Sequence, residues 1–225
     1  MGLMVPAMAA IDCYEAATVP LLADRMRRLL GQGGLLALPT ESFYGFAVDP
    51  FNEHALAKLW QVKGRSDGKP ILLLIGERSQ LEPFVQRVPP AATVLMNAFW
   101  PGPLTIVFPA VVGLSDMVTA GTGSVGIRQS AWHPLAELLR RVGPVTGTSA
   151  NREGLLPSCT AEDVQRSVGD RVDLIVDAGP TPGGSPSTVI DVQGPIRIVR
   201  EGAITREIIV RQLASHGMYL DGKSR

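Results

Sequence analysis

The chain contains few of the residues that build metal clusters and disulfide frameworks. It has two cysteines, Cys13 and Cys159, and three histidines that lie far apart in the sequence. A structural zinc site needs about four Cys or His ligands at short spacing, and small disulfide-rich domains need more cysteines than this. The sequence therefore excludes both classes and favours a reducing, cytoplasmic compartment.

Net charge and long apolar runs are also missing. The 21 Lys and Arg residues balance the 21 Asp and Glu residues, so the formal net charge is zero. A neutral chain has no global field that attracts nucleic acid, and any polyanion site has to be local. No run approaches the roughly 20 apolar residues of a membrane span, and residues 1–6 lack the positive charge of a signal peptide. We therefore expect no membrane contact.

Hydrophobic periodicity predicts helices and strands that alternate along most of the chain. Helices are expected over 14–31, 53–62, 90–99, 134–142, 160–168 and 206–213, with a short one near 81, and strands over 35–38, 71–75, 104–108, 125–128, 144–148, 174–176, 188–192 and 196–200. The last three strands follow one another without helices between them, which favours a partly antiparallel sheet. The predicted fold class is α/β, with a mixed sheet of parallel and antiparallel strands.

These elements fit one domain over residues 14–213. A chain of 225 residues is long enough to bury one sizeable core. We expect residues 1–13 to form a loose N-terminal segment and residues 214–225 to form a C-terminal tail. Residues 179–187 are rich in Pro and Gly and are expected to form a long loop that could act as a lid.

Positive charge is concentrated in one short segment. Three of the four lysines are Lys58, Lys63 and Lys69, and Arg65 lies among them beside Gly64. Cationic side chains next to glycine suit the close approach of a phosphate or carboxylate. The same residues could instead form a solvated helix end whose charges complement the helix dipole. This segment alone leaves both interpretations open.

Known phosphate-binding and nucleophile motifs are incomplete. The segment GTGSVG (121–126) satisfies the G-x-G-x-x-G pattern, but it precedes a predicted strand instead of opening a helix. The glycines before Lys69 do not have the spacing of a P-loop. The segment TSAN (148–151) lacks the closing glycine of a nucleophile elbow, so Ser149 is not expected to attack a substrate covalently.

Polar side chains stand where predicted strands end. Thr40 follows the first buried strand, Arg128 ends another, and TSAN (148–151) follows a third. Ligands gather at such ends in α/β sheets, and hydroxyls, Asn and guanidinium groups suit phosphates and carboxylates. Glu41 and Asp49 flank the first of these loops, but two loop carboxylates are usually solvated, and we assign them no role.

Seven motifs in order resemble the YrdC-like family of threonylcarbamoyl-AMP synthases over about residues 36–204. They are PTESFYG (39–45), KGR (63–65), FWPGPLT (99–105), VGIR (125–128), TSAN (148–151), PSTV (186–189) and VREGAI (199–204). Each motif is weak alone, and their joint order makes the resemblance specific.

The resemblance implies a twisted mixed sheet, flanked by helices, around a large central cavity. In that cavity ATP, L-threonine and bicarbonate would form threonylcarbamoyl-AMP and pyrophosphate. The product would supply downstream tRNA-modification proteins that make threonylcarbamoyladenosine. We expect Mg²⁺ because ATP normally arrives with it.

Functional residues carried over from the family fall into two groups. Threonine would be held by Thr40, Arg128 and Ser187. ATP would be contacted by Lys63, Ser149, Ser158 and Arg200, with Arg65 and Asn151 supporting the phosphates. Lys63 and Arg65 are the expected catalytic pair, because a triphosphate needs cations beside the leaving pyrophosphate. For this chemistry, the cationic segment and TSAN (148–151) should face each other across one enclosed hollow.

Two other functions stay open. The chain could adenylate a different carbamate, although it has no accessory zinc-binding or acylphosphatase-like segment. It could also be a module that binds double-stranded RNA or tRNA through Lys58, Lys63, Arg65 and Lys69. Zero net charge argues against RNA as its sole ligand.

Overall fold

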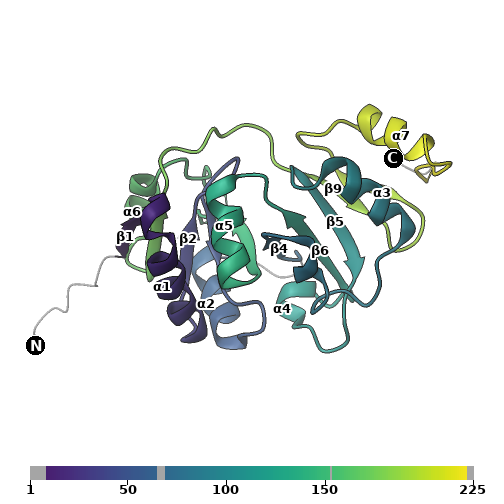
Figure 1. Cartoon of the computed structure of the whole chain (residues 1–225). Helices are drawn as coiled ribbons and strands as arrows, with labels where there is room; N and C mark the ends of the chain where they lie inside the picture. The colour runs from purple at the N-terminus through teal and green to yellow at the C-terminus, as the bar shows by residue number, and fades with distance from the viewer. Residues whose placement is uncertain (1–8, 65–68, 153, 222–225) are drawn as a thin grey trace, which may run out of the picture.

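The computed structural model describes residues 9–64, 69–152 and 154–221 (Figure 1). The strands are β1 (Ala10–Cys13), β2 (Leu36–Leu38), β3 (Gly45–Ala47), β4 (Leu72–Ile75), β5 (Leu104–Pro109), β6 (Ser124–Gln129), β7 (Val145–Ser149), β8 (Leu174–Asp177), β9 (Thr188–Asp191) and β10 (Arg197–Arg200). The α-helices are α1 (Val19–Gly31), α2 (Glu53–Lys63), α3 (Pro90–Phe99), α4 (Asp116–Thr119), α5 (His133–Val142), α6 (Ala161–Val168) and α7 (Arg206–Ala214).

The strands form one sheet in the order β1-β8-β2-β3-β7-β4-β6-β5-β9-β10. Strand β8 runs parallel to both β1 and β2, and the pairs β4·β6 and β5·β9 are also parallel. The other neighbouring strands are antiparallel. The predicted α/β fold with a mixed sheet is therefore confirmed.

The two ends of the described chain belong to the folded body, which corrects two boundaries. Residues 10–13 were expected to be loose, but they form β1 and pair with β8. A four-residue edge strand is too short to give a periodic pattern, and its partner lies far away in the sequence. In the expected tail, Leu220 forms a bridge with Ile196 and packs against the core.

The expected helix over 14–31 also begins later than predicted. A 3₁₀ turn occupies Ala16–Thr18, and α1 starts at Val19 with Pro20 in its first turn. Proline is favourable there because its missing N–H would have no partner inside the helix. The expected N-caps of α2 and α6 are confirmed, since Asn52 accepts from the backbone N–H of Ala55 and Thr160 accepts from that of Asp163.

Side chains alternate between the two faces of the sheet along each strand. Apolar side chains therefore lie on both faces, and helices cover both. On β2, Leu36 and Leu38 pack with α1 and α5, whereas Ala37, like Leu35 just before the strand, belongs to the core on the other face. Figure 1 shows α1 and α5 beside each other over the half of the sheet that contains β2. The second core contains buried residues of α2, α3, α6 and α7.

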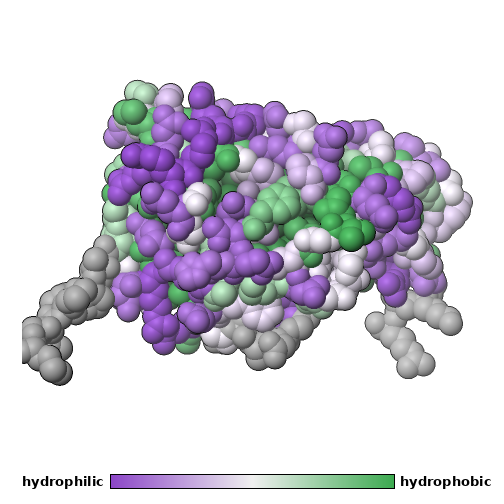
Figure 2. Space-filling model, turned by 90° about the horizontal axis from the view of Figure 1, so that it is seen from below, coloured by the Kyte–Doolittle hydropathy of each residue, from purple (hydrophilic) through white to green (hydrophobic). Residues whose placement is uncertain are grey.

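The surface mixes polar and apolar residues. Seen from below, hydrophobic residues gather toward the right of the molecule among mostly hydrophilic neighbours (Figure 2).

Among the helices of the described residues, none has both the length and the apolar character that a membrane span requires.

Candidate functional site

A cavity of about 660 Å³ opens on the sheet face that carries α1 and α5. Leu74 both lines the cavity and belongs to the core under these two helices, so the cavity continues the same face beyond them. Strand register explains its floor. Gly147 lies opposite Leu72, Gly126 lies opposite Val107, and all four residues line the cavity.

Two glycines of this floor lie directly against neighbouring side chains. A Cβ atom at Gly126 would lie 3.3 Å from Cγ2 of Thr105, and one at Gly147 would lie 2.6 Å from Cγ of Leu74. These distances mean that neighbouring side chains already occupy the space directly above both strands. A larger residue at either position would force these cavity-lining side chains to move.

Arg128 belongs to β6 and lies at one end of the cavity. It is 6% exposed, and its Nη2 lies 3.7 Å from Oε2 of Glu41. Within the described residues, Nε of Arg128 and Oε1 of Glu41 are buried without hydrogen-bond partners. Burial lowers the pKa of Arg128, the charge of Glu41 opposes this shift, and that of Arg200 adds to it. A cationic fork with an unmatched donor suits a ligand carboxylate.

Ser187, Thr105 and Arg200 form a second polar group on the cavity wall. The hydroxyl oxygens of Ser187 and Thr105 are 2.9 Å apart. Nη2 of Arg200 donates to the backbone carbonyl of Ser187 at 2.8 Å. The guanidinium of Arg200, in β10, is thus hydrogen-bonded to Ser187, which directly precedes β9.

Lys63 contacts the TSAN bend (148–151) directly. It is the last residue of α2, which ends at Gly64 in a left-handed conformation with φ of 63°. The Lys63 ammonium donates to the carbonyl and Oγ of Ser149 at 2.7 and 2.9 Å and to Oδ1 of Asn151 at 2.8 Å. We expected this segment and the bend to face each other across the hollow, and at Lys63 they instead touch.

The predicted site residues divide by position. Thr40, Arg128, Ser149, Ser187 and Arg200 line the cavity. Lys63 and Asn151 are buried behind Ser149. Ser158 is buried and donates its hydroxyl to the carbonyl of Ala150, so it supports the bend from outside the described cavity wall. Arg65 lies outside the described residues.

Thr40 organises the loop between β2 and β3. Its hydroxyl donates to the carbonyl of Phe43 at 2.7 Å and accepts from the backbone N–H groups of Ser42 and Phe43. These bonds close a tight turn at the cavity wall. A ligand at Thr40 would therefore meet a hydroxyl whose orientation the turn already fixes.

The Pro- and Gly-rich loop over 179–187 borders the same cavity through Gly184, Pro186 and Ser187. The Tyr44 hydroxyl donates to the carbonyl of Gly179 at 3.1 Å, and the N–H of Gly183 donates to the carbonyl of Ser42 at 2.8 Å. Burial, followed by the charge of Asp177, raises the pKa of Tyr44, which keeps this hydroxyl protonated.

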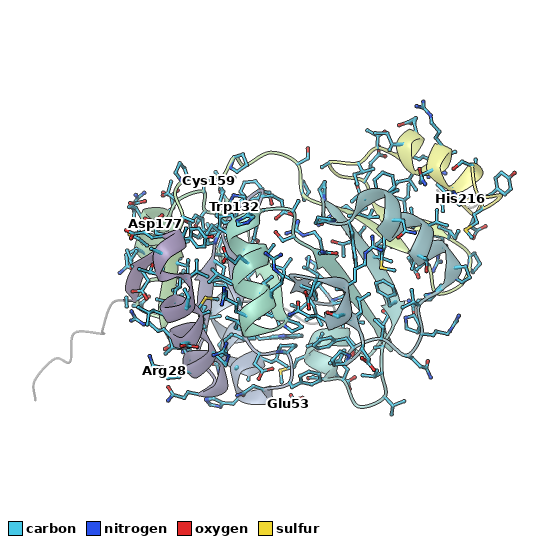
Figure 3. The ribbon with its side chains drawn as sticks, viewed as in Figure 1. Arg28, Glu53, Trp132, Cys159, Asp177 and His216 are labelled. Carbon is cyan, nitrogen blue, oxygen red and sulfur yellow. The ribbon has the colours of Figure 1, made fainter. Side chains whose placement is uncertain are left out.

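Figure 3 labels two residues at the end of the molecule where this loop is anchored. Asp177 ends β8, and Cys159 lies just before the N-cap of α6. The N–H of Thr181 donates to the carbonyl of Cys159 at 2.8 Å. The loop over 179–187 is therefore hydrogen-bonded to the loops that contain Ser42 and Cys159 before it reaches Gly184 at the cavity.

Two residues of the site had no predicted role. Glu41 was set aside as a solvated loop carboxylate, but it lies beside Arg128 with a side chain only 19% exposed. Thr105 belongs to the motif FWPGPLT (99–105), and its contact with Ser187 depends on the pairing of β5 with β9. The sequence motif already included Thr105, whereas the position of Glu41 beside Arg128 could be found only from the fold.

Comparison with known proteins identifies the family. A model of the Sua5, YciO and YrdC proteins, described as "Telomere recombination", matches residues 28–202. The threonylcarbamoyl-AMP synthase of Thiobacillus denitrificans is 40% identical over 164 residues, which cover 72% of this chain and 87% of the relative. The synthase of Coxiella burnetii is 37% identical over 166 residues, covering 73% and 89%. The chain belongs to the Sua5/YciO/YrdC family.

Solved structures share the fold. The crystal structure of Sua5 from Pyrococcus abyssi, complexed with L-threonine, matches with a TM-score of 0.82 and 28% identity over 97% of this chain. The chain spans 64% of that protein's length. YciO from Escherichia coli matches with a TM-score of 0.78 and 22% identity, covering 90% of this chain and 99% of YciO.

Proposed function

We propose that this chain is a threonylcarbamoyl-AMP synthase (L-threonylcarbamoyladenylate synthase), a nucleotidyltransferase that converts ATP, L-threonine and bicarbonate into threonylcarbamoyl-AMP, pyrophosphate and water. Relatives with this name cover most of the chain, and a structural neighbour binds L-threonine. The observation that carries the proposal is one cavity that joins Arg128 to Ser149, which is bonded to Lys63. Its volume falls within the range of about 300–1,000 Å³ typical of small-molecule sites.

Threonine would bind at the Arg128 end of the cavity. The guanidinium would hold the carboxylate, and the hydroxyls of Thr40 and Ser187 would orient the remaining polar groups. These three residues come from three separate loops and strands that meet only at the cavity wall. A substrate held at three points has few orientations left.

ATP would bind toward Ser149, with Asn151, Arg200 and the supporting Ser158 around it. An oxygen of threonine carbamate would form a bond to the α-phosphorus, and the bond from that phosphorus to the bridging oxygen would break. Pyrophosphate would leave with the electron pair, and Lys63 with Arg65 would neutralise its charge. Positioning and water exclusion are the main tasks, so no protein nucleophile is required.

Mg²⁺ is proposed only as the companion of ATP. Within the described residues, no three Asp, Glu, His or Cys side chains are grouped to hold a metal ion. Glu41, which lies beside the proposed threonine position, already faces Arg128. The described residues thus do not fit a protein-built Mg²⁺ site, and no step above depends on one.

The RNA-binding alternative has less support. Lys58 donates to Asp173 at 2.5 Å, and Lys63 is 8% exposed, so two of the four proposed contacts are engaged within the protein. A double-stranded RNA or tRNA module would lose affinity steeply with salt. A flat salt dependence of tRNA binding would count against that function. Supply of the product to tRNA-modification proteins remains part of our proposal.

Pyrophosphate release tests the function directly. It should require ATP, threonine and bicarbonate together, so omission of any one should abolish it. Release that continues without threonine would contradict the proposal. Release that requires bicarbonate but prefers another amine would indicate a different carbamate as substrate.

A further inference from the structure

Glu41 is the charged group at the cavity that the proposed reaction leaves without a role. It stands in the loop after β2, whereas Arg128 stands in β6, and the two side chains are 19% and 7% exposed. Burying a carboxylate is costly unless it is paired and hydrogen-bonded. The chain keeps this carboxylate mostly shielded from solvent beside the guanidinium, which indicates that its charge serves the site.

A short relay of hydrogen bonds fixes the Glu41 carboxylate. Ser130, which is fully buried just after β6, donates its hydroxyl to Oε2 of Glu41 at 3.0 Å. The backbone N–H of Trp132 donates to Oγ of Ser130 at 3.2 Å. Trp132 lies at the N-terminal end of α5 (Figure 3). The carboxylate is thus oriented by the segment that joins β6 to α5.

The distance from Glu41 to Arg128 indicates an electrostatic role. At 3.7 Å, Oε2 of Glu41 is too far from Nη2 of Arg128 for a good hydrogen bond, but close enough for charge attraction. Arg128 can therefore keep its donors for a ligand. Within the described residues, its buried Nε has no hydrogen-bond partner.

The charge balance of the cavity supports the same role. Arg128 and Arg200 both line it, and the charge of Arg200 lowers the pKa of Arg128. Glu41 opposes that effect. One carboxylate against two guanidinium groups leaves a net positive charge, which a carboxylate ligand would neutralise.

We propose that Glu41 and Ser130 are positioning residues, which hold the Arg128 guanidinium in place for the carboxylate of threonine. This inference rests on the proposed function. Ser130 orients Glu41, and Glu41 acts on Arg128 by charge. Neither residue needs to touch threonine.

Two complementary variants test this role by calorimetric titration with L-threonine and, separately, with ATP. Glu41→Gln keeps an acceptor for Ser130 but removes the charge, and Ser130→Ala keeps the charge but removes its anchor. We expect Glu41→Gln to weaken threonine binding by about tenfold and Ser130→Ala to weaken it less, with ATP affinity within about twofold of wild type. Glu41→Asp should recover part of the loss. Glu82→Gln, at an exposed position off the cavity wall, is the matched control.

The outcomes separate this inference from the proposed function. If wild-type protein binds no threonine, the proposed function fails and the inference fails with it. If wild type binds threonine and both variants bind it equally well, only the inference is overturned. A smaller number of binding sites at unchanged affinity would show a purely structural role and would also overturn it.

Discussion

Two cationic side chains at or behind the cavity wall differ in whether their donors already have partners in the protein. The Lys63 ammonium donates to oxygens of Ser149 and Asn151, so its position is fixed by the protein. The Arg128 guanidinium is buried and holds Nε without a partner among the described residues. A fixed cation suits a phosphate chain, and a fork with a spare donor suits a carboxylate.

Replacing Arg128 should separate the two substrates. We expect Arg128→Ala to raise the KM for threonine by about tenfold to a hundredfold, because a charge-assisted contact to the carboxylate is lost. The KM for ATP should change much less. Steady-state pyrophosphate release at varied threonine and varied ATP measures both. Arg197→Ala, an exposed arginine on β10, is the control, and equal losses for both substrates would contradict the assigned role.

Replacing Lys63 should affect the rate. We expect Lys63→Met to slow threonine-dependent pyrophosphate release by about a hundredfold or more, because a preorganised charge beside the leaving group is removed. Rapid-quench measurement of a single turnover at saturating ATP isolates this step. Arg166→Met, on the exposed side of α6, should leave the rate unchanged. A normal single-turnover rate in Lys63→Met would refute a catalytic role.

At the scale of elements, the sequence predicts the long, periodic segments well. The helices α3, α5 and α6 begin and end within a residue of their expected bounds because a proline in the first turn of α3 and α5 and the Thr160 cap of α6 mark where they start. The strand β1 was missed, and β3 was merged with a polar loop, since strands of three or four residues carry little periodic signal. Their pairing depends on partners that are distant in the sequence.

The same limit applies to the site. The motifs identified the residues that line the cavity, such as Thr40 and Ser187, because the residue types and strand ends are local features. They did not show that Glu41 faces Arg128, because that contact needs two loops to meet. Nor did they show that Lys63 bonds directly to Ser149. Local chemistry was readable from the sequence, and contacts between distant segments were not.

The start of β9 depends on one buried hydroxyl. Thr188 donates to the carbonyl of Ile204 at 2.5 Å and accepts from the N–H groups of Gly202 and Ile204. We expect Thr188→Val to lower the free energy of unfolding by about 2–4 kcal/mol, because these N–H groups lose their partner. Urea denaturation measures the change, and Thr188→Ser should restore most of it. Unchanged stability in the valine variant would show that the hydroxyl is dispensable.

The loop over 179–187 should respond to loss of one anchor. We expect Tyr44→Phe to speed amide hydrogen exchange at Thr181 and Gly183, because the hydroxyl no longer holds the carbonyl of Gly179. Exchange within β8, which lies in the sheet, should stay as it is in wild type. Mass spectrometry of proteolytic fragments resolves the two segments. Equal exchange rates in both proteins would mean that the tyrosine does not restrain the loop.

At the scale of the whole molecule, the site is a property of most of the sheet. Its walls come from β3, β7, β4, β6, β5, β9 and β10, so residues from most of the described chain must be in place before the cavity exists. The net charge of zero adds no long-range field, which makes the local arginine and lysine groups decisive for anionic ligands. The proposed reaction therefore depends on one cavity that holds both substrates together.

The most direct measurement is a crystal structure with L-threonine and a non-hydrolysable ATP analogue present together. We expect both molecules in the cavity, with the threonine carboxylate hydrogen-bonded to Arg128 and the phosphates toward Ser149 and Lys63. Binding of threonine and nucleotide at the same position, one excluding the other, would contradict the proposed reaction. A nucleotide bound elsewhere on the molecule would contradict it as well.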